Sequence, residues 1–319
     1  MINILVTGVG AIIGYGITRT LKSLDLPICV TGVDIFPHAV GQYWCDSFES
    51  VVKTNDLEYS NCILKVIKKH RINVILPAIE QDVLWFSRNR SLFEDQGIKC
   101  ILNKADLIEL CQDKWLFYKH IEEGGQKIIP SSLSDNFSEL ISNLGCPFLI
   151  KPRTSYASKG IEIIKSEDQF SAFSQKMGHK YLAQKLIGDD DHEYTASTFG
   201  YGDGTCSSKI VMRRYLHQAG STDRIEIVTE PELEKNIDAL SQFLKPLGPT
   251  NFQYRLHEGH FYLLEINPRF SSSNSLRAKF GFNEALMSLK FYLENEKMQN
   301  IDLKFGKAIR YFEDIVVYE

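Results

Sequence analysis

The sequence lacks the features that mark membrane, zinc-finger and nucleic-acid-binding proteins. No apolar run approaches the roughly 18 residues of a membrane-spanning helix, and no basic leader precedes the strand-like residues 4–6. The seven cysteines include no C-x-x-C pair, which favours reduced, mostly buried thiols over metal knuckles or redox pairs. Basic and acidic residues nearly balance, 36 against 40, so no basic face for nucleic acid is indicated. We therefore expect a cytoplasmic globular protein that enters no membrane.

The hydrophobic pattern divides the 319 residues into two parts. Short apolar runs at 2–7, 28–33 and 74–76 alternate with stretches of helical periodicity at 14–24 and 57–70, which predicts β-α-β units on a parallel sheet. Farther along, a helix at 105–123 is followed by short strands, and from residue 192 onward by long strands with hairpin turns. We expect an α/β domain at 1–106 and an α+β domain at 107–319.

A glycine-rich turn follows the first strand, with Gly8, Gly10, Gly14 and Gly16. Asp34 ends the second strand 20 residues after Gly14, where dinucleotide-binding folds place an acid that binds ribose. The spacing is G-x-G-x-x-x-G-x-G rather than G-x-G-x-x-G, with Ile13 at the third glycine position. Two interpretations stay open: the glycines serve only a tight turn, or the loop binds NAD in an oxidoreductase.

Polar side chains follow one face of a predicted β-hairpin at residues 251–267. With a period of two, Glu265 and Asn267 share a face, and Gln253 has the same parity on the partner strand. Carboxylate and amide oxygens suit magnesium, and Arg269 directly after them suits a phosphate or carboxylate. The alternative is a solvated polar face. The opposite face of the second strand would carry Tyr262, Leu264 and Ile266.

Two lysines lie in apolar surroundings, where an ammonium group needs an anion. Lys151 ends the apolar run 148–150, and Lys114 precedes Trp115. The small-residue loop 154–160 offers amides and hydroxyls to phosphate, and the strand-like residues 181–187 could offer main-chain groups to a flat base. Glu193 leads the next strand, where a carboxylate can accept two ribose hydroxyls. The acidic residues 189–191 indicate a solvated turn.

Taken in order, these segments resemble the ATP-grasp superfamily over essentially the whole chain. The strongest match is residues 264–282, LEINPRFSSSNSLRAKFGF, similar to the E-x-N-P-R-x-S-x-S stretch of the carbamoyl-phosphate synthetase large subunit. The resemblance implies a Rossmann-like pre-ATP-grasp domain followed by an ATP-grasp domain of two α+β lobes, a lid lobe at about 113–187 and a C-terminal lobe at about 188–319. It also implies ATP and Mg²⁺ (or Mn²⁺) as cofactors.

The resemblance implies a role for each candidate residue. Lys114 and Lys151 would contact the ATP phosphates, and Ser155, Ser158 and Gly160 would belong to the loop that folds over them. Gln184 would hold the adenine together with the backbones of Lys185 and Ile187, and Glu193 would bind the ribose. The metal ligands would be Gln253, Glu265 and Asn267. Arg269 would stabilise the phosphoryl group during transfer, and Arg214, with Arg213 as the alternative, would face the acyl phosphate. Gly10 and Glu80 would line the acceptor pocket, unless Glu80 only caps a helix.

The activity implied by the resemblance is an ATP-dependent ligation. A small-molecule carboxylate would form an acyl phosphate, and an amine would displace the phosphate to give an amide. Gln184 stands where a Glu is frequent, which could alter the affinity for nucleotide or the nucleotide preference. Ser271 occupies a position that is often basic in the synthetase branch. Because the chain ends soon after the grasp region, carbamoyl phosphate synthesis by this chain alone is not expected. An NAD-dependent oxidoreductase and a non-catalytic nucleotide-binding protein are the alternatives, and a homodimer is compatible with the resemblance.

Overall fold

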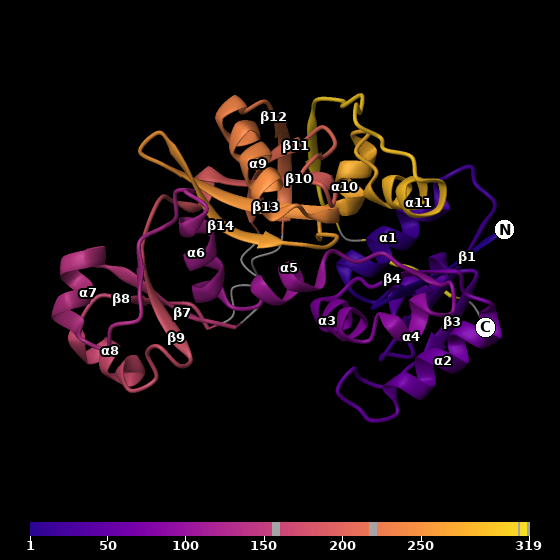
Figure 1. Ribbon diagram of the computed structural model, residues 1–319, viewed down its shortest axis with the longest axis horizontal. Helices are drawn as coiled ribbons and strands as arrows, with labels where there is room; N and C mark the ends of the chain where they lie inside the picture. The colour runs from indigo at the N-terminus through magenta and orange to yellow at the C-terminus, as the bar shows by residue number, and fades with distance from the viewer. Residues whose placement is uncertain (155–159, 217–221, 312, 318–319) are drawn as a thin grey trace.

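The computed structural model describes residues 1–154, 160–216, 222–311 and 313–317. Three sheets of five, six and four strands organise these described residues, and each lies in its own part of the molecule (Figure 1). This arrangement confirms the predicted fold class, an α/β unit followed by two α+β lobes. Within the described ranges, no helix combines the length and apolar character needed to cross a bilayer.

The five-stranded sheet is parallel and has the order β3-β2-β1-β4-β5. Its strands are β1 (Ile2–Thr7), β2 (Ile28–Asp34), β3 (Ser47–Ser50), β4 (Val74–Leu76) and β5 (Lys99–Cys100). Its helices are α1 (Ile12–Lys22), α2 (Tyr59–His70), α3 (Glu80–Arg88) and α4 (Ser91–Glu94), with a short 3-10 helix η1 (Val40–Trp44). Alternate residues of β1 pack on opposite faces, Leu5 in one core cluster and Ile4 and Val6 in the other. The carboxyl ends of β1, β2 and β4 therefore meet at one edge.

The four-stranded sheet has the order β6-β9-β7-β8. It contains β6 (Ser131–Ser132), β7 (Phe148–Pro152), β8 (Glu162–Ile164) and β9 (Tyr181–Lys185), with α7 (Phe137–Leu144) and α8 (Glu167–Ser174) beside it. The single helix predicted at 105–123 is wrong. It is two helices, α5 (Ala105–Leu110) and α6 (Lys114–Glu123), because the Asp113 side chain accepts the backbone N–H groups of Trp115 and Leu116 and starts a new helix.

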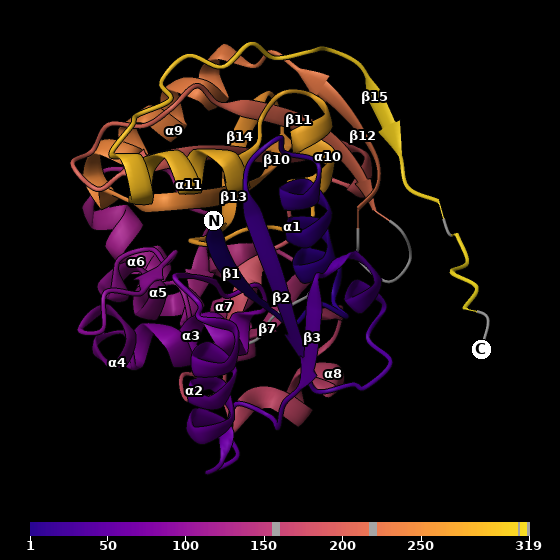
Figure 2. The ribbon, with the colours of Figure 1, turned by 90° about the vertical axis from the view of Figure 1, so that its right-hand side faces the viewer.

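The six-stranded sheet is antiparallel, in the order β14-β13-β10-β11-β12-β15. Its strands are β10 (Glu193–Tyr201), β11 (Ile210–Leu216), β12 (Thr222–Val228), β13 (Leu247–His257), β14 (His260–Asn267) and β15 (Lys307–Ile309). The helices are α9 (Pro231–Leu244), α10 (Asn274–Lys279) and α11 (Glu284–Glu294), with a 3-10 turn η2 (Asp190–His192). Figure 2 shows α1 between the parallel sheet and α10, where the Asn274 side chain donates to the Ile13 carbonyl at 3.2 Å.

A β-bulge interrupts the predicted alternation in β14. Gln253 pairs with Glu265 but Tyr254 pairs with Leu263, which leaves Leu264 as an extra residue. Leu263 and Ile266 are therefore the core-facing residues, whereas Tyr262 and Leu264 are only half buried. The prediction that Tyr262, Leu264 and Ile266 share the core face is wrong for the first two, because a period of two cannot anticipate an inserted residue.

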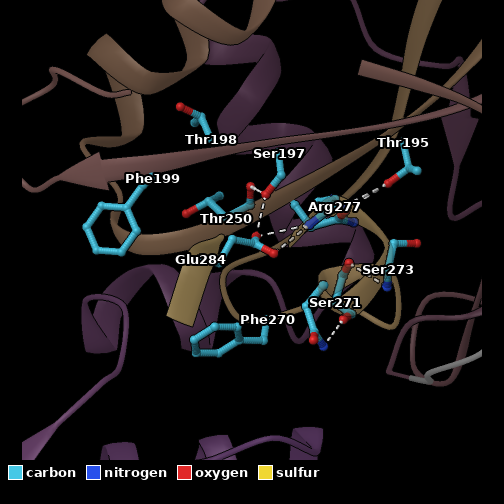
Figure 3. Close-up of polar contacts among 12 residues, drawn as sticks. Thr195, Ser197, Thr198, Phe199, Thr250, Phe270, Ser271, Ser273, Arg277 and Glu284 are labelled. Carbon is cyan, nitrogen blue, oxygen red and sulfur yellow. Dashed lines mark hydrogen bonds and ion pairs between the residues drawn. The ribbon is translucent and has the colours of Figure 1, made fainter. Parts of the chain in front are cut away.

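A completely buried ion pair lies against strands β10 and β13 (Figure 3). The Arg277 guanidinium is 3.0 Å from the Glu284 carboxylate, and both side chains are fully inaccessible. Ser197 donates to Glu284 at 2.7 Å, while Arg277 also donates to Asn251. The pair thus joins α10 and α11 to β10 and to β13, the first strand of the polar hairpin.

Breaking this pair should destabilise the protein more than removing it. We expect Glu284→Gln to lower the free energy of unfolding by roughly 3–5 kcal/mol, because an uncompensated buried guanidinium remains. The double replacement Arg277→Met with Glu284→Leu should recover most of that loss. Urea unfolding followed by circular dichroism measures both. Equal destabilisation in the single and the double variant would show that packing volume, rather than charge pairing, matters here.

Candidate functional site

Lys114 and Lys151 are brought together by a clamp between α6 and β7. The Asp113 carboxylate accepts the Arg153 guanidinium at 2.6 Å, and the Lys114 backbone N–H donates to the Arg153 carbonyl at 2.9 Å. Both contacts connect the first residues of α6 to the chain just after Lys151. Sequence reasoning missed this clamp, although an acidic residue before Lys114 and an arginine shortly after Lys151 were visible signals.

Helix α6 is anchored in turn on the bulge of β14. The Tyr118 hydroxyl donates to the Leu264 carbonyl at 2.8 Å. Lys114 lies four residues before Tyr118 and therefore on the same helix face. Burial lowers the pKa of Lys114, and the nearby charges of Glu265 and Glu80 partly oppose that shift. The bulge thus provides the carbonyl that holds Lys114 over the polar hairpin.

Lys151 is a buried cation held by a neutral group. Its side chain is 8% exposed, and its Nζ donates to the Gln184 side-chain oxygen at 2.5 Å. Burial lowers the pKa of Lys151 to about 8, while the charge of Glu265 favours the protonated form and the charges of Lys114 and Arg255 oppose it. An ammonium group whose contact is a neutral amide is strongly stabilised when an anion binds beside it.

The orientation of the Gln184 amide follows from Ser131. Ser131 Oγ donates to the Ile129 carbonyl at 2.9 Å, so it can only accept from Gln184 Nε2, also at 2.9 Å. The oxygen of Gln184 must therefore face Lys151. On the neighbouring main chain, the Lys185 N–H donates to the Pro130 carbonyl, so a base contact at Lys185 would use its carbonyl. The Ile187 side chain is buried.

Placing a carboxylate at Gln184 should change the charge state of Lys151. We expect Gln184→Glu to form an ion pair at this 2.5 Å contact and to raise the pKa of Lys151. The alkaline limb of the pH dependence of ATP binding, measured by calorimetry, should then move to higher pH. Gln184→Leu, which keeps the shape but removes the contact, is the matched variant and should not move that limb upward. An identical limb in wild type and Gln184→Glu would contradict this expectation.

Glu265 and Asn267 lie side by side at the end of β14. Asn267 Nδ2 donates to Glu265 Oε1 at 2.9 Å, and Asn267 Oδ1 accepts from Arg269 at 3.0 Å. Both residues are half buried, and Glu265 interacts electrostatically with Lys114 and Lys151. One carboxylate and one carboxamide fit a Mg²⁺ ion that takes its other ligands from water and phosphates. The described residues contain no group of three His, Cys, Asp or Glu side chains that could hold a metal alone.

Gln253 fits the predicted metal role less well. It pairs with Glu265 in register, as predicted, but its side-chain oxygen accepts from Arg214 at 2.6 Å. A guanidinium at this distance repels a divalent cation, so Arg214 would have to turn away before Gln253 could bind the metal.

Arg214, rather than Arg213, points toward the predicted site residues. It contacts Glu193 and Gln253, whereas the Arg213 Nε donates to the Asp191 carbonyl. Glu193 is 3% exposed and also accepts Arg255 at 3.0 Å, and the two arginines hold its pKa down against the opposing effect of burial. Its predicted contact with ribose hydroxyls would compete with these partners. Arg255 belongs to the site as well, although in the sequence only its parity with Gln253 on the same strand indicates this.

Only one predicted residue of the phosphate loop is described. Ser155 and Ser158 lie outside the described residues. Gly160, just after them, has a φ of +75°, and a Cβ there would meet the Pro152 ring at 2.9 Å. A glycine is therefore required where the chain returns to β8.

The glycine turn after β1 binds an acid of the protein itself. The Gly10 N–H donates to Asp34 Oδ2 at 2.7 Å, and the other carboxylate oxygen accepts the Phe36 N–H at 3.0 Å. A Cβ on Gly14 would lie 2.2 Å from the Gly8 carbonyl, so this glycine serves close packing. These contacts favour the tight-turn interpretation over NAD binding, because Asp34 occupies an amide that a pyrophosphate would need.

Glu80 and Arg269 connect the parallel-sheet unit to the hairpin. Their side chains form an ion pair at 2.9 Å, and Glu80 also accepts Gln112 at 3.0 Å. Glu80 is the first residue of α3, and the capping position before it is Ile79. The alternative that Glu80 caps this helix is therefore wrong. A pocket lies between the two units, lined by Glu80, Gln112, Cys111, Asn267 and Arg269 together with apolar side chains.

Two protein-family models match the chain. The model described as "PylC-like, N-terminal domain" matches residues 4–101, and "ATP-grasp in the biosynthetic pathway with Ter operon" matches residues 190–315. The arginine-specific carbamoyl phosphate synthase large chain of Halalkalibacterium halodurans is 25% identical over 93% of this chain. The corresponding chain of Geobacillus stearothermophilus is 26% identical over 66%. The chain spans only 30% and 21% of the lengths of these relatives.

Solved structures share the fold. N5-carboxyaminoimidazole synthetase from Staphylococcus aureus, in complex with ADP, superposes with a TM-score of 0.74 at 15% identity, covering 95% of this chain and 80% of that chain. The biotin carboxylase domain of Hydrogenobacter thermophilus 2-oxoglutarate carboxylase, solved with MgADP and bicarbonate, gives 0.74 at 16% identity, with 96% and 73% covered. Sheet order, family models and relatives agree that the chain carries a PylC-like N-terminal domain at residues 4–101 and an ATP-grasp domain at residues 190–315.

Proposed function

We propose that this protein is an ATP-dependent carboxylate-amine ligase. A substrate carboxylate attacks the γ-phosphate of ATP, ADP leaves, and an amine then attacks the acyl phosphate and releases phosphate as the amide forms. The relatives and structural neighbours include a carbamoyl phosphate synthase and a structure with bound MgADP, which supports ATP and Mg²⁺ as cofactors. No side-chain nucleophile is needed, because positioning and charge neutralisation are sufficient for phosphoryl transfer.

The observation that carries this proposal is the meeting of opposite charges from three elements. Lys114 of α6 and Lys151 of β7 both interact electrostatically with Glu265 of β14. Two buried or half-buried ammonium groups facing a carboxylate and a carboxamide make a site for a triphosphate with its metal. In this proposal the lysines contact the phosphates, while Glu265 and Asn267 hold Mg²⁺.

The remaining residues take roles that match their positions. Gln184, Lys185 and Ile187 lie at the adenine end, Glu193 lies at the ribose, and Arg214 and Arg269 neutralise the transferred phosphoryl group. Residues 1–106 form the domain that borders the acceptor pocket through Gly10 and Glu80. The lid lobe extends over about 113–187 and the C-terminal lobe over about 188–319. The protein acts on small molecules, and a homodimer remains a prediction from the resemblance.

A screen for carboxylate-stimulated turnover tests the proposal. Amino acids and small organic acids are added one at a time to the protein with MgATP, and ADP and phosphate release are measured. Release that depends on one added carboxylate supports the ligase. Nucleotide binding without release under any addition would favour a non-catalytic ATP-grasp protein. Binding of NAD at the glycine turn would favour the oxidoreductase.

A further inference from the structure

We infer that Glu80 recognises the amine substrate as an ammonium ion, by exchanging its present partner Arg269 for the substrate's positive charge. This inference rests on the proposed ligase function. It gives the substrate class of the acceptor, a small aliphatic primary amine, and it links binding of that amine to release of Arg269.

The starting point is an ion pair that the proposed reaction cannot keep unchanged. Arg269 Nη2 lies 2.9 Å from Glu80 Oε2, and the two side chains are 16% and 25% exposed. Arg269 also donates to Asn267 Oδ1, so it stands beside the proposed metal ligand. When a phosphoryl group forms its fork-like contact with Arg269, that guanidinium can no longer neutralise Glu80 fully.

Glu80 would then be a partly buried carboxylate next to a newly bound anion. Lys114 also interacts with Glu80, but in the proposed function it serves the phosphates. Two anions that share too little positive charge repel each other, and a cation from the substrate removes that repulsion. The Gln112 amide donates to the second oxygen of Glu80 at 3.0 Å and keeps the carboxylate in place during the exchange.

The pocket beside Glu80 has a volume of about 20 Å³, which admits one ammonium-sized group, so an aliphatic chain behind that group has to occupy the space that the Arg269 side chain leaves. Val83, Ile108 and Ile266 line it together with Glu80 and Arg269. Its polar wall is formed by the same residues that flank the proposed reaction centre, Asn267 and Arg269. An ammonium at Glu80 therefore lies on the side of Arg269 that faces the parallel-sheet unit, close to where the acyl phosphate would form.

The exchange also gives the amine a route to its reactive form. The ammonium transfers one proton to the Glu80 carboxylate and becomes a neutral amine. Its nitrogen lone pair then forms the C–N bond as the bond between the acyl carbon and the phosphate oxygen breaks. The second nitrogen proton leaves with the phosphate as hydrogen phosphate, and Glu80 returns its proton to solvent. Atoms and charge balance without any further reactant.

Hydroxylamine provides the test, because it attacks acyl phosphates as a neutral nucleophile and carries no ammonium charge at neutral to alkaline pH. The protein with MgATP and each of the amino acids and small organic acids of the turnover screen is assayed for hydroxamate. The KM values of ammonium chloride, short alkylamines and amino acids as acceptors are then measured. The variants are Glu80→Gln, Glu80→Asp and Glu109→Gln. Glu109 is the matched control, because it pairs with Arg88 on the exposed surface of the neighbouring helix α5.

We expect Glu80→Gln to raise the KM of the cationic amine about 30-fold more than that of hydroxylamine, in line with the loss of one charge-assisted contact. Glu80→Asp should recover part of this ratio, and Glu109→Gln should leave it unchanged. If Glu80→Gln leaves both KM values unchanged, or raises the KM of the cationic amine and that of hydroxylamine equally, the inference is overturned while the ligase proposal stands. Absence of hydroxamate in the wild type would instead overturn the ligase proposal and this inference with it.

Discussion

Replacing Glu265 with Gln is expected to lower carboxylate-dependent ADP formation by about 1,000-fold, the effect of removing a preorganised charge at a phosphoryl-transfer site. Glu265 is the carboxylate that faces both Lys114 and Lys151, and an amide in its place would hold a divalent cation weakly. Steady-state phosphate release over a range of Mg²⁺ concentrations measures the effect.

The matched control is Glu226→Gln. Glu226 lies in β12 of the same sheet, is 38% exposed and pairs with the exposed Lys307, so its loss should leave turnover unchanged. Circular dichroism and thermal unfolding should show both variants folded. Turnover of Glu265→Gln within tenfold of the wild type would remove Glu265 from the metal site.

Replacing Lys151 with Met is expected to weaken ATP binding by about 100-fold and to remove most of its pH dependence on the alkaline side. The pKa of Lys151 is about 8 in the free protein, because burial disfavours its charge. Phosphate binding requires the protonated form, so the affinity of the wild type for ATP should fall by up to about tenfold per pH unit above that value. Calorimetry at several pH values measures both the affinity and the proton uptake.

The stability of the free protein should change in the opposite direction. Between pH about 8 and the ordinary lysine value of 10.5, the unfolded chain binds more protons at Lys151 than the folded chain does. The free energy of unfolding of the wild type should therefore rise with pH across this window relative to Lys151→Met. Parallel stability curves for the two proteins would show that Lys151 keeps an ordinary pKa in the fold.

Much of the fold was visible in the sequence because its signals are local. Strands β1 and β4 were predicted with their observed bounds, since each is a short apolar run next to a helical stretch. The break before Lys114 was missed because it depends on the Asp113 side chain capping a helix. The bulge at Leu264 was missed because it is a property of strand pairing, which periodicity within one strand does not reveal.

The candidate site was predictable in its residue types but not in its contacts. Glu265 and Gln253 were expected to share a face, and they do pair, because the extra residue Leu264 between the turn and this pair shifts the register by one. The contact of Arg214 with Gln253, the Glu80–Arg269 pair and the Ser131–Gln184–Lys151 chain join residues 39, 189 and up to 53 positions apart. Such contacts depend on how strands far apart in the sequence pair and how the units pack, which no local pattern encodes.

The most direct test of the central claim is a crystal structure with a non-hydrolysable ATP analogue and Mn²⁺, whose anomalous signal locates the ion. We expect the ion at about 2.2 Å from a carboxylate oxygen of Glu265, with the phosphates in contact with Lys114 and Lys151. A nucleotide bound at the glycine turn after β1, with no metal near Glu265, would contradict the account.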